Sequence, residues 1–116
     1  MSGVDYPNQP PINWVRCQCF YTFSGGAPTL WQSYNVSSLT DLGTGDTQVN
    51  FTKNINWDLY YVPLFANMGG LAANIVIAQG TLGAGITNTQ LRLITQDYTA
   101  TMYDTPVSMA ILGNFE

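Results

Sequence analysis

Residues 41–46, "DLGTGD", place two glycines and two carboxylates within six residues, a composition that could serve phosphate or metal binding. A glycine-rich phosphate loop must lead into a helix, whose N-terminal amides and dipole face the anion. Here the loop leads into the strand-like "TQVNF", and Asp41 and Asp46 alone do not supply the spaced oxygens of a calcium loop. The sequence therefore predicts a hairpin turn, with Gly43 and Gly45 in left-handed backbone and both aspartates accepting hydrogen bonds from nearby amides.

A second glycine-rich stretch, "GTLGAGIT" at residues 80–87, could suggest a dinucleotide site. Its glycine spacing differs from the dinucleotide fingerprint, and no strand–helix–strand pattern surrounds it. We expect a flexible loop that is able to touch a partner.

Catalytic side chains are scarce. The chain has no histidine, and Lys53 is its one lysine, so its serines and threonines lack an activating base. Asp58, Asp97 and Asp104 would suffice for sugar hydrolysis if two of them met in space, but no motif brings any two together. The sequence favours a protein that is not an enzyme and that uses no cofactor and no metal.

Charge is the most unusual feature of the composition. Charged residues make up 9% of the chain, against about 25% in typical domains, so we expect other chains to cover much of the surface. The chain has only three basic residues and seven acidic ones, which argues against nucleic acid as a partner. No apolar run approaches the roughly 20 residues of a membrane helix, and the N-terminus lacks a signal-peptide pattern, so we expect no membrane insertion.

Cys17 and Cys19 stand one residue apart, where strand alternation places them on the same face and strains any bridge between them. Arg16, the nearest cation in sequence, falls on the opposite face. We expect two reduced thiols that serve as small apolar side chains, in keeping with assembly in a reducing cytoplasm.

The elements that must position these residues are strands. Period-two alternation and turn signals every 8 to 12 residues predict about seven or eight short strands, and no segment has the period of a helix. A kink is expected near Tyr34–Asn35, and Pro63 suggests an edge strand or a bulge. The fold class is therefore all-β, an antiparallel β-sandwich (jelly-roll-like) over residues 12–116. The expected strands contain residues 14–21, 29–39, 46–52, 58–66, 74–79, 91–95 and 105–113.

Residues 1–11 have a different character. Pro7, Pro10 and Pro11 remove backbone donors and favour an extended chain, so this segment is expected to form an N-terminal arm. Two interpretations stand side by side. The arm is either a frayed terminus or a strap that docks on a partner with Tyr6 as its anchor.

Four segments of the sequence resemble a small β-sandwich module of tailed bacteriophages, found at the ends of tail-fibre proteins and in small virion structural proteins. The resemblance covers nearly all of the chain from Trp14 onward, and the second of these segments is the most specific. The segments are "WVRC" at 14–17, "NVSSLTDLGTGDTQVNFT" at 35–52, "YYV" at 60–62 and "DTPVSMAILGN" at 104–114.

The resemblance implies a non-enzymatic virion component, assembled in the bacterial cytoplasm, that forms a homotrimer and contacts other virion proteins. We expect a fibre or tail-tip module involved in host attachment, with a host-surface glycan or protein as a further partner. The alternative is a capsid-decorating protein, seated by its N-terminal arm, that stabilises the shell. A carbohydrate-binding or carbohydrate-cleaving domain, with Trp31 or Trp57 as a sugar platform, is less favoured because aromatic residues at strand spacing more often form core or interface.

Overall fold

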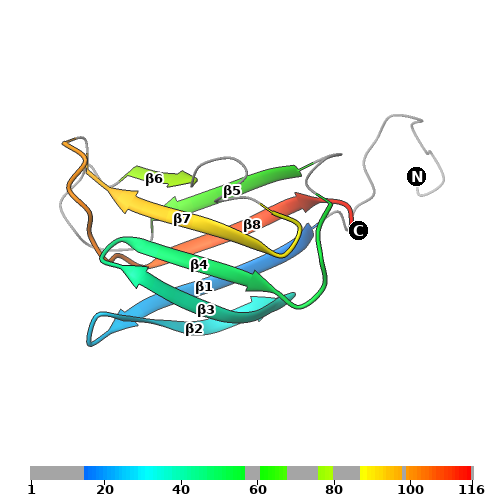
Figure 1. Ribbon diagram of the computed structural model, residues 1–116, viewed down its shortest axis with the longest axis horizontal. Helices are drawn as coiled ribbons and strands as arrows, with labels where there is room; N and C mark the ends of the chain where they lie inside the picture. The colour runs from blue at the N-terminus through cyan, green and yellow to red at the C-terminus, as the bar shows by residue number, and fades with distance from the viewer. Residues whose placement is uncertain (1–14, 57–60, 68–75, 80–86, 98, 116) are drawn as a thin grey trace, which may run out of the picture.

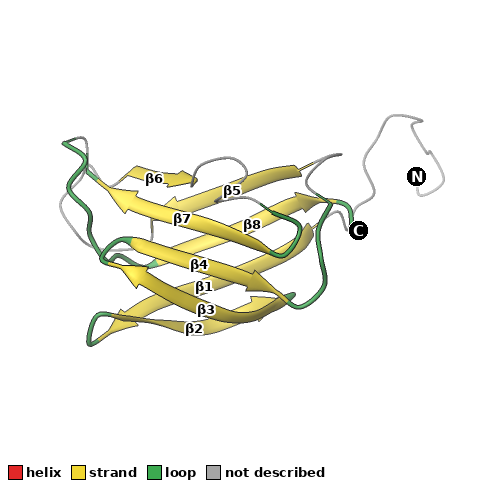
Figure 2. Ribbon diagram, in the orientation of Figure 1, coloured by secondary structure: helices red, strands yellow, loops and turns green. Residues whose placement is uncertain are grey.

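The computed structural model describes residues 15–56, 61–67, 76–79, 87–97 and 99–115, and within them it contains eight strands and no helix (Figures 1 and 2). The strands form two four-stranded antiparallel sheets that stack on each other, which confirms the predicted β-sandwich. Residues 1–14, including the arm residues Tyr6, Pro7, Pro10 and Pro11, lie outside the described residues. The strands are β1 (Val15–Ser24), β2 (Ala27–Tyr34), β3 (Val36–Gly43), β4 (Asp46–Phe51), β5 (Tyr61–Asn67), β6 (Val76–Gln79), β7 (Gln90–Gln96) and β8 (Val107–Gly113).

The strand order is β2-β1-β8-β5 in one sheet and β3-β4-β7-β6 in the other. The first and last strands, β1 and β8, pair in the middle of the first sheet, and Figure 1 shows the second sheet in front of it. β5 lies at an edge, as Pro63 predicts, because a proline in a central strand would remove a ladder hydrogen bond. The remaining edges are β2, β3 and β6.

The core lies between the sheets and follows the predicted alternation. In β1, β7 and β8 every second residue is buried, so each strand directs one row of side chains inward and the other outward. Burial of these inward side chains is the main favourable term in folding. The fully or nearly fully buried apolar residues are Cys17, Cys19, Tyr21, Val49, Phe51, Ile55, Leu91, Leu93, Val107, Met109 and Ile111.

Asn35 is the corner at which the chain passes from the first sheet to the second, between β2 and β3. Its φ of 60° lies in the left-handed region, which asparagine tolerates better than most side chains. Its Nδ2 donates to the carbonyl oxygens of Arg16 (2.8 Å) and Lys53 (2.9 Å), and its Oδ1 accepts from the Lys53 amide (2.6 Å). One side chain thus joins the start of β1 to the end of β4. The chain bends near residue 35 as predicted, but residues 29–39, predicted as one strand, form the two strands β2 and β3 in different sheets, because the chain crosses between the sheets at this corner.

The two cysteines are buried and unpaired with each other, as predicted. Burial raises the pKa of the Cys19 thiol to about 12, and burial together with the neighbouring Cys19 raises the pKa of Cys17. In the unfolded chain both thiols ionise near their ordinary pKa of 9.0. Above that pH the unfolded state binds fewer protons than the folded state, so the free energy of unfolding falls as the pH rises.

We therefore expect ionisation of these thiols to leave the free energy of unfolding unchanged below about pH 8 and to lower it increasingly above that pH. From pH 8 to pH 9.5 the free energy of unfolding should drop by about 1.5 kcal/mol, because each thiol contributes up to about 1.4 kcal/mol per pH unit. Guanidinium denaturation at the two pH values measures the drop. In the Cys17→Ala/Cys19→Ala variant most of this drop in the free energy of unfolding should disappear. If the drop were undiminished, groups other than the two thiols would be its cause.

Candidate interaction faces

The glycine loop at residues 41–46 is a turn, as predicted. Gly43 and Gly45 both have positive φ, and the Asp41 Oδ1 accepts a hydrogen bond from the Gly43 amide at 3.0 Å. The two carboxylate oxygens of Asp46 bind the guanidinium of Arg92, at 2.8 Å from Nε and 2.5 Å from Nη2, in place of the expected amide. This ion pair has no signal in the sequence, because the two residues are distant along the chain and meet only when β4 pairs with β7.

Gly45 is enclosed by the connection between β7 and β8. Its amide donates to Asp104 Oδ1 at 2.7 Å, and its carbonyl oxygen accepts from the Thr95 amide at 2.8 Å. The residue itself is buried. The amide that could have faced an anion is therefore occupied by a carboxylate of the same chain.

Asp97 organises the same connection. Its Oδ1 accepts hydrogen bonds from the Thr99 amide (2.8 Å), the Thr99 hydroxyl (2.6 Å) and the Thr101 amide (3.0 Å), and its Oδ2 accepts from the Tyr103 hydroxyl (3.3 Å). These bonds, the Thr99 hydroxyl first among them, lower the pKa of Asp97. A carboxyl group held in its ionised form is poorly suited to donate a proton as a general acid.

Of the three aspartates that could have formed a hydrolytic pair, two bind backbone amides and the third is not described. Asp97 accepts hydrogen bonds from backbone amides of the connection between β7 and β8, and Asp104 accepts one from the Gly45 amide in the turn between β3 and β4. Asp58 lies outside the described residues. In the part of the chain that the structure describes, no three His, Cys, Asp or Glu side chains gather into a set that could hold a metal ion.

All three basic side chains contact groups of their own chain. The Arg16 guanidinium carbon lies 5.0 Å and the Lys53 Nζ 4.3 Å from the centre of the Phe115 ring, within the range of cation–π attraction. Arg92 binds Asp46. The cations therefore form no basic stripe along which a phosphate backbone could lie.

The outer side of strands β3, β4 and β7 is polar and hydrogen-bonded within itself; we call it the polar face. The Asn50 Nδ2 donates to the hydroxyls of Ser38 (3.0 Å) and Thr40 (2.9 Å). The Gln48 Nε2 donates to Asn50 Oδ1 at 2.8 Å, and Gln90 Nε2 donates to Gln48 Oε1 at 2.9 Å. Amides and hydroxyls from three strands thus satisfy one another on this face, which keeps it polar with little charge.

The outer face of the sheet β2-β1-β8-β5 is different in kind; we call it the apolar face. Strand pairing arranges its side chains in two rows that cross the four strands. Neither row contains a charged residue. The first row is Tyr34, Gln18, Ala110 and Leu64, and the second row is Gln32, Phe20, Ser108 and Ala66, each running from β2 to β5.

Trp31 reaches the apolar face because of a β-bulge. The register between β1 and β2 shifts between Phe20 and Tyr21, so Trp31 is the extra residue of β2 between Leu30 and Gln32. Its Nε1 donates to the Thr22 hydroxyl at 2.6 Å, and its side chain is 66% exposed. Of the two tryptophans considered as sugar platforms, Trp31 is thus surface-exposed, and Trp57 lies outside the described residues.

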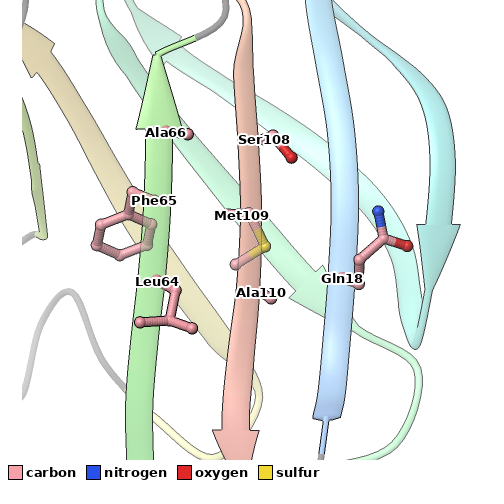
Figure 3. Close-up of a pocket in the computed structure, with 7 residues that line it drawn as sticks. All are labelled: Gln18, Leu64, Phe65, Ala66, Ser108, Met109 and Ala110. Atoms are coloured by element: carbon pink, nitrogen blue, oxygen red, sulfur yellow. The ribbon is translucent and has the colours of Figure 1, made fainter.

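A shallow depression lies on the apolar face above β8, between β1 and β5 (Figure 3). The surface is low here because β8 contributes the small outward side chains Ser108 and Ala110. Leu64 of β5, which is 51% exposed, stands higher beside them. The residues that line it are Gln18, Leu64, Phe65, Ala66, Ser108, Met109 and Ala110.

No protein-family model, no curated protein and no solved structure matches this chain. The described residues contain no apolar helix of membrane-spanning length. The glycine loop at residues 41–46 is a structural turn, whereas residues 80–86 of the second glycine-rich stretch lie outside the described residues. The feature that stands out in the described part of the chain is the contrast between the two outer faces.

Proposed function

We propose that this protein is a non-enzymatic structural module that assembles with copies of itself, and that it is a virion component of a tailed bacteriophage. The observation that carries the first part is the apolar face, whose two rows hold no charge and which exposes Trp31, Tyr34 and Leu64 by 66%, 50% and 51%. Exposed aromatic and aliphatic side chains gathered on one face in this way mark interaction sites. The second part is supported by the resemblance of the hairpin and of the closing strand to phage fibre modules.

The composition supports assembly as well. A charged share of 9% leaves most of the surface without charge, and the three basic side chains contact groups of their own chain. The resemblance supports a homotrimer in a fibre or tail tip that serves host attachment. The two described carboxylates that could have served hydrolysis hold backbone amides instead, which fits a protein without catalytic chemistry.

Native mass spectrometry at micromolar concentration tests the assembly. We expect a trimer, and a monomer under these conditions would contradict the proposal. Labelling the protein on intact virions and imaging the label tests its location on the particle. A signal at the tail or fibre supports host attachment, a signal over the shell supports capsid decoration, and absence from the particle contradicts a virion role.

A further inference from the structure

The two cysteines occupy neighbouring inward positions of β1, a strand in the middle of its sheet. β1 pairs with β2 on one side and with β8 on the other. Its pairing with β8 is regular from Cys17, opposite Ile111, to Tyr21, opposite Val107. Both thiol side chains have an exposed fraction of 0% and belong to the core between the sheets. The strand can therefore shorten at this place only if its pairing and its packing are disrupted.

A disulfide between Cys17 and Cys19 does not fit this strand. Side chains two residues apart on one face of a strand stand nearly parallel, so their Cβ atoms are separated by about 6.7 Å, twice the rise per residue. A disulfide needs Cβ atoms about 3.5 to 4.5 Å apart. Closing the bridge would shorten the strand by roughly 2 Å, and so displace a cysteine from its partner in β8. In the unfolded chain the backbone is free to leave the extended conformation, and only Gln18 separates the two thiols.

From this geometry we infer that the Cys17–Cys19 pair is a redox gate on folding. The chain folds only while both thiols are reduced, and the folded protein then shelters them from oxidation. The gate goes beyond the proposed function, because it acts wherever the protein is located. Its consequence is that folding is confined to a reducing compartment, whereas a folded copy keeps its thiols after it leaves that compartment.

The oxidant that closes the gate is a small disulfide such as oxidised glutathione. In the unfolded chain one cysteine thiolate attacks a sulfur of this disulfide and expels a glutathione thiolate. The second cysteine thiolate then attacks the sulfur now bound to the chain and expels the other glutathione thiolate. The chain loses two protons and two electrons, and two reduced glutathione molecules carry them away. In the folded protein burial raises the pKa of both thiols, that of Cys19 to about 12, so the attacking thiolate is scarce and solvent does not reach it.

Refolding of the oxidised chain tests the gate. The protein is unfolded in guanidinium with oxidised glutathione at about pH 8.5, near the thiol pKa, freed of glutathione and diluted out of denaturant. Mass spectrometry identifies the chain that has lost two hydrogen atoms, the mark of the internal bridge. We expect this chain to lack the strand signal in circular dichroism and dithiothreitol to restore it. The control is the same chain taken through the procedure without glutathione, which should refold in full.

Two results of this experiment would overturn the inference. The first is a bridged chain that regains the strand signal without reductant, because the bridge would then be compatible with β1. The second is an unfolded chain that forms no internal bridge under these conditions, because the pair could then not block folding.

Exposure of the folded protein to the same oxidant tests the shelter. Because reaction must wait for unfolding, the thiols of the folded protein should be lost at least about a thousandfold more slowly than those of the chain in guanidinium. The matched control is Ser38→Cys/Thr40→Cys in the Cys17→Ala/Cys19→Ala background, which sets the same spacing at exposed positions of the edge strand β3. Its thiols should react in the folded protein within about tenfold of the unfolded rate.

Equal rates for the native thiols in the folded and unfolded chain would show that the fold does not shelter them, and would overturn the inference. Both tests use the parent chain, so they stand even if the control variant does not fold.

Discussion

Replacing Gly45 with alanine should destabilise the protein by about 4 kcal/mol, as strongly as a severe core substitution. A Cβ built on Gly45 would lie 2.5 Å from the Thr95 carbonyl oxygen and 2.9 Å from the Tyr103 amide nitrogen. Both are backbone atoms, so neither can move aside as a flexible side chain would. The φ of 67° adds the strain that any L side chain meets in left-handed backbone. Equilibrium unfolding in guanidinium, with folding followed by circular dichroism, measures the loss.

Gly25→Ala is the matched control for this prediction. Gly25 has a similar φ of 61°, but a Cβ there would meet no atom within 4 Å. Its substitution should cost only about 1 kcal/mol, the share that comes from backbone conformation alone. Equal losses of unfolding free energy at the two glycines would show that the backbone around Gly45 can move to accommodate a Cβ. The description of Gly45 as enclosed would then be wrong.

Ile111→Ala should cost about 3 kcal/mol, because the isoleucine is fully buried between the sheets and its truncation leaves a cavity. The adjacent Leu112 loses the same number of carbon atoms in Leu112→Ala, yet its side chain lies on the outer side of β8 and is only partly buried. We expect that variant to lose about 1 kcal/mol or less. Thermal and denaturant unfolding of the two variants side by side measures the difference.

The contrast between these neighbours tests which side of β8 faces the core. A one-residue slip of the strand would exchange the two sides, and with them the two losses. Similar losses at both positions would contradict the assignment of Leu112 to an outer face. Because Leu112 borders the apolar face, its variant should be measured below the concentration at which copies associate, so that assembly does not add to the apparent stability.

Much of the fold could be predicted because strand signals are local. The alternation at Cys17, Cys19 and Tyr21 is typical of a strand with one buried row, which the structure confirms. Paired glycines such as Gly25 and Gly26 are typical of a tight turn, and the structure forms one there with both φ values positive. Pro63 suggested an edge strand or a bulge, and β5 lies at an edge. Each of these follows from the geometry of a residue and its immediate neighbours, so no knowledge of the tertiary structure is needed.

The candidate site could not be predicted in the same way. The partner of Asp46 is 46 residues away in sequence, and Asp104 reaches the amide of Gly45 across 59 residues. The rows of the apolar face depend on which strands lie side by side, and Trp31 reaches that face through a bulge whose position no local pattern revealed. Both glycine-rich segments have a composition that could suggest a ligand site, but the structure shows that the loop at residues 41–46 is a turn.

By itself, the amino-acid sequence determined the strand class, the buried rows, the turns and the scarcity of charge, because these depend on residue type and on spacings of a few residues. The tertiary structure alone decided that the amides of Gln48, Asn50 and Gln90 gather on one outer face while two rows without charge, edged by aromatic residues, cross the other. The reason is that a face belongs to four strands at once. Its character is set by the strand order and by register across long sequence separations, and many orders are compatible with the same local signals.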